Sequence, residues 1–166
     1  KESDYLDVIN YKTAELFSAA CQIGGEVSEA SSEKKSSLAE FGTLLGMAYQ
    51  IIDDTLDYFS DSKSIGKSSG NDLKEGKMSL PLIICFKRCN KREKKIIEYI
   101  ICKENTNQSD FIKILDLMKK YDVKTDCVKK AKHFSLMAKD SLGIFSDSLE
   151  KEKLLSLVEY LTHRSK

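Results

Sequence analysis

The sequence has little proline and no long apolar run. Pro81 is its only proline in 166 residues, and no segment alternates apolar and polar residues as a half-buried strand does. These absences favour an all-α fold. No apolar run approaches the roughly 20 residues that a transmembrane helix needs, so we expect no membrane span.

The sequence also lacks a marked net charge. Lysine and arginine total 27 against 26 acidic residues, which gives a formal net charge of +1. A nucleic-acid-binding domain usually carries a basic surplus, so we expect no nucleic acid partner. With 41% hydrophobic and 32% charged residues, the composition is typical of one soluble helical unit over residues 1–166.

Paired cysteine motifs are missing as well. The five cysteines include no CxxC pair, and both histidines lie far along the chain from Cys85 and Cys89. We therefore expect free thiols in a reducing, intracellular compartment. Metal or redox chemistry at Cys85 and Cys89, one helical turn apart, is the alternative.

The sequence shows no initial methionine, signal peptide or transit-like segment. In addition, its helical periodicity begins as early as about the fourth residue. We therefore expect the chain to begin part-way through a longer protein.

Helical periodicity covers most of the chain. Gly24 and Gly25 favour the end of the first helix, and Ser79 followed by Pro81 favours the start of another. Residues 60–78 show no periodicity and are expected to form a loop. The helices are expected at residues 4–22, 36–59, 79–89, 91–103, 110–121, 123–143 and 150–164.

The segment QIIDDTLDYF, residues 50–59, places three carboxylates among apolar residues. At 100° per residue, one side of this helix carries small and polar residues. The other carries the apolar residues Phe41, Leu45, Ala48 and Ile52 and is expected to face the core. Because glycine in an exposed helix costs about 1 kcal/mol, we interpret the first side as bordering a cavity. Its residues are Gly42, Thr43, Gly46, Gln50, Asp53 and Asp57, with Asp54 beside them.

Asp53 and Asp57 lie one turn apart and could hold one divalent cation, Mg2+ in particular. A solvated acidic patch is the alternative. Carboxylates are disfavoured near the C-terminal end of a helix, where the dipole is negative, so the pattern favours the metal.

Lys12 lies in the middle of an apolar stripe on the first expected helix. The stripe consists of Tyr5, Val8, Ile9, Leu16, Ala19 and Ile23. Such a lysine either extends its ammonium group to water or meets an anion. The first outcome is the common one, and the second would give the helix a binding role.

The expected loop combines glycines with lysines. Glycine lets a backbone approach a phosphate closely, and lysine supplies positive charge. The spacing is not that of a P-loop, and a surface loop without function is the alternative. Together with the carboxylates and Lys12, it indicates a diphosphate bound as its magnesium complex. The residues are Gly66, Gly70, Gly76, Lys63, Lys67, Lys74 and Lys77.

Three segments resemble the trans-isoprenyl diphosphate synthases. DDTLD, preceded by LLGMAYQI and followed by GKSSGNDLKEGKMSLPLI, is similar to the second aspartate-rich region of that family. INYKTAELF resembles its lysine-threonine helix, and LLSLVEYLTHR its C-terminal end. The resemblance implies the C-terminal half of the all-α isoprenoid synthase fold.

The resemblance also implies roles for single residues. The metal ligands would be Asp53 and Asp57, with Asp54 in support. The allylic diphosphate would contact Lys12 and Lys67, and the developing allylic cation would lie near Thr13 and Gln50. The loop's polar network would include Asp72 and Lys77.

The implied activity is prenyl transfer, in which Mg2+ assists ionisation of an allylic diphosphate and isopentenyl diphosphate then adds to it. The segments GMAYQIIDD and GNDLKEGK resemble the sequences of long-chain polyprenyl synthases more closely than those of farnesyl diphosphate synthases. The family implies a homodimer for the full-length enzyme. A quinone side chain as product would place it in mitochondria.

The family's first aspartate-rich motif is missing from this sequence, because no second DDxxD occurs. We therefore expect the chain to be inactive alone. The alternative is a non-catalytic helical protein, such as a regulatory or interaction subunit of a heteromeric synthase.

Overall fold

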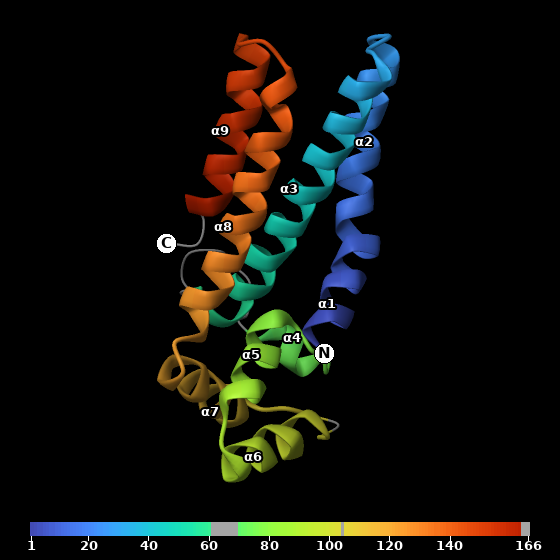
Figure 1. Ribbon diagram of the computed structural model, residues 1–166. Coiled ribbons are helices and arrows are strands. Elements are labelled where there is room, and N and C mark those ends of the chain that lie inside the picture. Colours follow the sequence, from blue (N-terminus) through green and yellow to red (C-terminus); the bar gives the residue numbers. More distant parts are fainter. Residues whose placement is uncertain (61–69, 104, 164–166) are drawn as a thin grey trace. The chain divides into compact units, whose positions relative to one another are not determined.

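The computed structural model describes residues 1–60, 70–103 and 105–163 (Figure 1). Every regular element among them is helical, which confirms the predicted all-α fold class. The elements are α1 (Glu2–Ile9), the π-helical turn η1 (Asn10–Ala14), α2 (Glu15–Val27), α3 (Ser32–Phe59), α4 (Asn71–Lys74), α5 (Leu80–Arg88), α6 (Lys91–Ile101), α7 (Gln108–Lys120), α8 (Val123–Ser141), the 3-10 turn η2 (Leu142–Ile144) and α9 (Leu149–His163).

Among the described residues, none of these helices is long and apolar enough to span a bilayer.

The chain forms two compact units. The first holds Lys1–Tyr5 and Asp53–Cys127, and the second holds Leu6–Ile52 and Val128–Lys166. The chain passes from one unit to the other within α1, α3 and α8. The expected single domain over residues 1–166 stays a prediction.

The second unit is held together by apolar side chains from its long helices. Its buried cluster contains Phe41, Leu44, Leu45, Ala138, Leu142, Val158 and Leu161. Phe41 and Leu45 lie on the apolar side expected for α3, so that side was predicted correctly from the sequence.

The other side of α3 differs from the expectation. A Cβ atom at Gly42 would lie 2.5 Å from the carbonyl oxygen of Phe17, and one at Gly46 would lie 2.6 Å from Cα of Ala14. The interpretation of these glycines as a cavity border is therefore wrong. They are small because the backbone of η1 and α2 packs directly against them.

The first unit is organised around aromatic side chains and capped helices. Tyr58 stacks on Phe111 with ring centroids 6.1 Å apart. Gly70 has a φ of 82°, and a Cβ there would lie 2.4 Å from the Phe111 ring. Glycine is required at this position by both its backbone conformation and its surroundings.

Several helix boundaries differ from those expected. The first predicted helix is divided by η1, and α2 continues through Gly24 and Gly25 to Val27. The chain turns only after Ser28, where Glu29 adopts a positive φ of 53°. The next helix begins at Ser32, four residues earlier than expected.

The expected loop over residues 60–78 is wrong in one part, because Asn71–Lys74 form the short helix α4. Four residues are too few to show a helical period. Two backbone N–H groups of this helix, those of Asn71 and Asp72, donate hydrogen bonds to the side chain of Asp57. Lys63, Gly66 and Lys67 lie outside the described residues.

Candidate functional site

The aspartates of the DDTLD motif occupy three different environments near the end of α3. Asp54 is buried and accepts a 2.7 Å hydrogen bond from the hydroxyl group of Tyr5 on α1. Tyr5 is itself buried, and this burial, together with the nearby Asp54 carboxylate, raises the pKa of Tyr5. The phenol therefore keeps its proton and acts as a donor that fixes the Asp54 carboxylate.

Asp57 holds the start of α4. Its two carboxylate oxygens accept hydrogen bonds from the backbone N–H groups of Asn71 at 3.2 Å and Asp72 at 3.0 Å. Its carbonyl oxygen accepts a third from Gly70 at 2.9 Å. A carboxylate is favoured there because the first N–H groups of a helix lack partners within it. Asp57 thus joins the end of α3 to the segment that follows residue 69.

Asp53 is the exposed member of the motif. Its side chain forms no hydrogen bond or ion pair with the residues that the structure describes. No cluster of three or more histidine, cysteine, aspartate or glutamate side chains suited to a metal occurs in that part of the chain. Mg2+ usually binds through one or two carboxylates, completed by water and phosphate oxygens. One exposed carboxylate therefore fits this ion.

Thr13 and Gln50 meet in the second unit. The Thr13 hydroxyl donates a 2.7 Å hydrogen bond to Oε1 of Gln50, joining η1 to α3. The two residues were expected to share a role at the same site, and the structure brings them together. Thr13 lies in a π-helical turn, a rare conformation that is frequent at functional sites.

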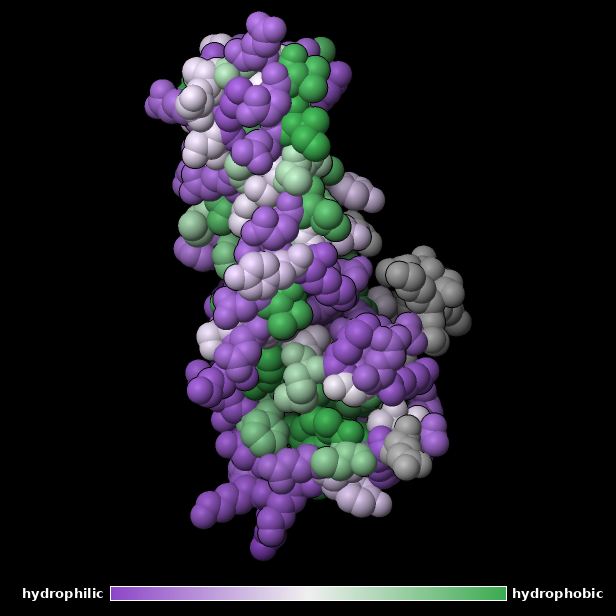
Figure 2. All heavy atoms as spheres, turned by 90° about the vertical axis from the view of Figure 1, so that its right-hand side faces the viewer, coloured by the Kyte–Doolittle hydropathy of each residue, from purple (hydrophilic) through white to green (hydrophobic). Residues whose placement is uncertain are grey.

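Lys12 lies in the same turn and is exposed. Its apolar neighbours on the helix face divide into two groups, since Ile9 is buried but Val8 and Leu16 are mostly exposed. Figure 2 shows hydrophobic residues among hydrophilic ones on the side of the molecule where α2 lies. The exposed large hydrophobic residues of α1, η1 and α2 are Val8, Tyr11, Leu16, Ile23 and Val27. The ammonium group of Lys12 is therefore accessible to an anion beside an apolar surface.

Asp72 and Lys77 lie close together in the first unit. Their charged groups are 3.7 Å apart, and the backbone N–H of Lys77 donates to the carbonyl oxygen of Asp72 at 2.8 Å. Lys77 also pairs with Glu75, and a hydrogen bond to this carboxylate raises the pKa of Lys77. This part of the expected polar network is present, whereas Lys67 lies outside the described residues.

The cysteines include one close pair, Cys85 and Cys89, whose Sγ atoms lie 3.9 Å apart. All five are free. Burial raises the pKa of Cys127 to about 12 and also raises the pKa values of Cys85 and Cys89. Without a metal, these thiols stay protonated near neutral pH and are weak nucleophiles. The reducing compartment stays a prediction.

The sequence interpretation missed Tyr5, which it counted only as part of the apolar stripe around Lys12. A buried tyrosine usually finds a partner for its hydroxyl, and this rule could have singled it out. The identity of the partner depends on residues 49 positions apart, which no local pattern reveals.

Most of the chain is similar in sequence to known proteins. The family model described as Polyprenyl synthetase matches residues 1–118. The geranylgeranyl diphosphate synthase of Sulfolobus acidocaldarius is 37% identical over 123 residues, which are 74% of this chain and 37% of that protein. The octaprenyl diphosphate synthase of Haemophilus influenzae is 31% identical over 156 residues, 94% of this chain and 47% of that protein.

Solved structures give the same result. A decaprenyl diphosphate synthase from Rhodobacter capsulatus has a TM-score of 0.92 at 32% identity, covering 100% of this chain and 51% of its own. A polyprenyl synthase from Caulobacter crescentus, in complex with calcium and isoprenyl diphosphate, has a TM-score of 0.94 at 31% identity with the same coverage. The chain spans about half the length of these two proteins.

Proposed function

Because this chain belongs to the polyprenyl synthetase family, we propose that it supplies the second aspartate-rich part of a prenyl diphosphate synthase. The reaction joins an allylic diphosphate to isopentenyl diphosphate. The relatives that support it are named as prenyl diphosphate synthases and are about twice as long as this chain.

The arrangement of the three aspartates carries the proposal. Tyr5 fixes Asp54, and Asp57 holds the segment that begins at Gly70. Asp53 is left as the exposed carboxylate, and we assign it the main contact with the ion. This differs from the equal roles expected for Asp53 and Asp57, and it leaves Asp54 and Asp57 as residues that position the site.

Mg2+ is the cation that this donor suits, since a hard oxygen ligand prefers a hard ion. A calcium ion accompanies isoprenyl diphosphate in the Caulobacter crescentus structure, which supports a divalent cation here. When bound, Mg2+ neutralises charge on the diphosphate that leaves the allylic carbon.

The other expected residues act on the organic substrate. Lys12 and Lys67 would add positive charge at the departing diphosphate. The Thr13 hydroxyl donates its hydrogen bond to Oε1 of Gln50, so its oxygen lone pairs can turn toward a developing allylic cation. Asp72 and Lys77 would hold the segment after residue 69 in place.

A long-chain product is our proposal for the specificity. The matched octaprenyl and decaprenyl synthases support it, whereas the matched geranylgeranyl synthase makes a shorter product by its name. The first aspartate-rich motif is not in this sequence, so we propose that this polypeptide is inactive alone. A homodimer is proposed for the full-length enzyme.

A non-catalytic interaction subunit is the second candidate. Exposed large apolar side chains in α1 and α2, among them Leu16 and Val27, favour it, because exposed apolar surface can mark a protein interface. This candidate needs no ion at Asp53.

Calorimetry with pyrophosphate and Mg2+ separates the two candidates. We expect magnesium-dependent pyrophosphate binding by the chain, and a loss of affinity of tenfold or more in Asp53→Ala, because one preorganised charge contact is removed. Asp116→Ala, at an exposed position of α7, is the matched control. Equal affinity in all three proteins would favour the interaction subunit.

A further inference from the structure

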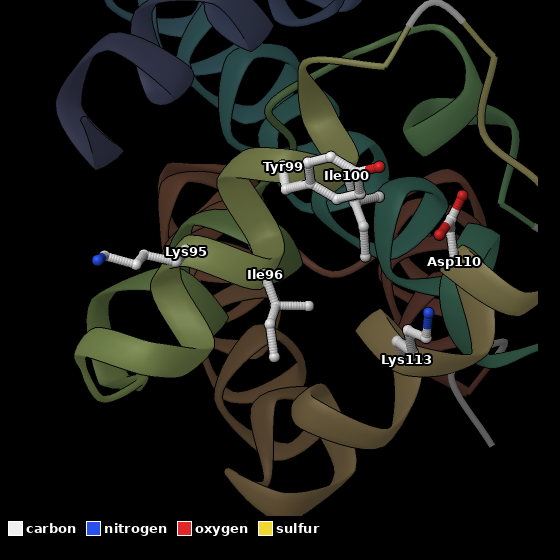
Figure 3. Close-up of a pocket in the computed structure, with 6 residues that line it drawn as sticks. All are labelled: Lys95, Ile96, Tyr99, Ile100, Asp110 and Lys113. Atoms are coloured by element: carbon white, nitrogen blue, oxygen red, sulfur yellow. The ribbon is translucent and has the colours of Figure 1, made fainter.

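The first unit has an open pocket that the proposed reaction does not use. It has a volume of about 320 Å³ and lies between α6 and α7. Figure 3 shows Ile96 and Ile100 of α6 pointing toward the space that Lys113 of α7 borders, while Lys95 extends away from it. The six lining residues are Lys95, Ile96, Tyr99, Ile100, Asp110 and Lys113.

The pocket combines a buried floor with an exposed apolar edge. Ile100 is buried, whereas Ile96 is 43% exposed and Tyr99 is 67% exposed. Large apolar side chains that remain this exposed beside a pocket commonly mark a binding surface. Tyrosine is typical of surfaces that have one apolar side and one wet side.

Two of the acids in residues 91–120, Asp110 and Glu93, are paired with neighbours, whereas Glu98 and Asp116 are exposed. Asp110 is buried, and both its oxygens accept hydrogen bonds from Nζ of Lys103, at 2.9 and 2.8 Å. Glu93 accepts hydrogen bonds from Lys120 and Tyr121, each at 2.6 Å. Asp110 is the acid among the pocket's lining residues, and because Lys103 neutralises it, the lining presents little negative charge.

The remaining lysines have no such partners. Lys91, Lys95, Lys113 and Lys119 form no ion pair with any carboxylate in the part of the chain that the structure describes. Residues 91–120 contain eight basic and five acidic residues, a net charge of +3, although the whole chain carries only +1. Of these four lysines, Lys95 and Lys113 line the pocket, so its lining carries positive charge that no carboxylate of the described residues pairs.

We propose that the face formed by α6 and α7 binds an anionic lipid surface, with Ile96 and Tyr99 entering the interface and the lysines contacting headgroups. α6, with the sequence KREKKIIEYII, buries Ile97 and Ile100 in the protein. Its exposed apolar side chains, Ile96 and Tyr99, are flanked by lysines and are the part that can enter an anionic interface. An anionic lipid surface presents negative headgroups above an apolar layer. The lysines are complementary to the headgroups, and Ile96 and Tyr99 are complementary to the apolar layer.

Vesicle flotation tests the proposal on the whole chain. We expect binding to vesicles of phosphatidylglycerol and phosphatidylcholine in equal parts, no binding to phosphatidylcholine alone, and weaker binding as salt rises. The double variant Lys95→Glu/Lys113→Glu should reduce the partition coefficient by about tenfold or more, since each lysine near such a surface contributes about fivefold.

Two further variants make the test specific. Lys129→Glu/Lys132→Glu changes two exposed lysines of α8 by the same total charge and should bind like wild type. Ile96→Ser/Tyr99→Ser keeps the charge and should also weaken binding, with circular dichroism confirming that the helices persist. The proposal is overturned if the wild-type chain does not bind anionic vesicles, or if the two double lysine variants reduce the partition coefficient equally. Binding to polyglutamate but not to vesicles would also overturn it, and would indicate an acidic protein partner.

Discussion

The hydroxyl group of Tyr5 donates a 2.7 Å hydrogen bond to Oδ2 of Asp54, a residue 49 positions further along the chain. Only 7% of Tyr5 and 9% of Asp54 is exposed to solvent. The bond therefore joins α1 to α3 inside the first unit and fixes one carboxylate of the DDTLD motif. Tyr5 is thus a positioning residue for the proposed ion site.

Replacing Tyr5 with phenylalanine removes this bond and leaves the ring in place. A hydrogen bond to a charged group contributes about 1.5–3 kcal/mol, so Tyr5→Phe should lower the free energy of unfolding by about that amount, as measured in urea. We also expect weaker magnesium-dependent binding of pyrophosphate. Tyr11→Phe, at a position 76% exposed, is the control. Equal losses in both variants would contradict the proposed role.

Asp53 and Asp57 should respond differently to the same substitution. Asp57→Ala removes the acceptor of two backbone N–H groups, at Asn71 and Asp72. We expect faster hydrogen exchange at these two amides and a loss of stability of about 0.5–2 kcal/mol, as for other helix-capping side chains. Asp53→Ala should leave the two amides protected and weaken ion binding. Unchanged exchange in Asp57→Ala would show that its carboxylate does not hold α4.

Gly42 and Gly24 provide a matched test of packing in the second unit. Gly42→Ala places a Cβ atom 2.5 Å from the carbonyl oxygen of Phe17, so the helices must move apart. We expect a destabilisation of about 1–3 kcal/mol, the usual range for overpacking. Gly24→Ala meets no atom within 4 Å and should instead stabilise α2 by up to about 1 kcal/mol. Thermal unfolding of the two variants gives the answer, and a stable Gly42→Ala would restore the cavity interpretation.

The all-α fold class was predicted correctly because apolar residues recur with helical spacing along most of the chain. The apolar side of α3, with Phe41 and Leu45, was assigned correctly for the same reason. The role of Gly42 was not, because a helical projection shows which residues share a side but not what covers that side. A ligand cavity and a closely packed helix both require a small residue there.

The different roles of the aspartates also could not be predicted from the sequence. The pattern placed Asp53 and Asp57 on one helix face but could not show that backbone N–H groups beyond residue 69 occupy the Asp57 carboxylate. α4 was missed because four residues show no period, and its start depends on this distant side chain. Contacts between separate segments decided both points.

Glu93 gives the first unit a predictable dependence on pH. Hydrogen bonds from Lys120 and Tyr121 and from the backbone of Asn90 lower the pKa of Glu93 to about 2, from 4.5 in an unfolded chain. Because its pKa is lower in the folded state, Glu93 stabilises the fold above pH 4.5, and this contribution is lost as the pH falls toward 2. Glu93→Gln should therefore be less stable than wild type at neutral pH, and the two proteins should converge as the pH falls toward 2. Urea unfolding at several pH values measures this, with Glu98→Gln on the same helix as the control. A constant difference between wild type and Glu93→Gln across that range would contradict the assignment.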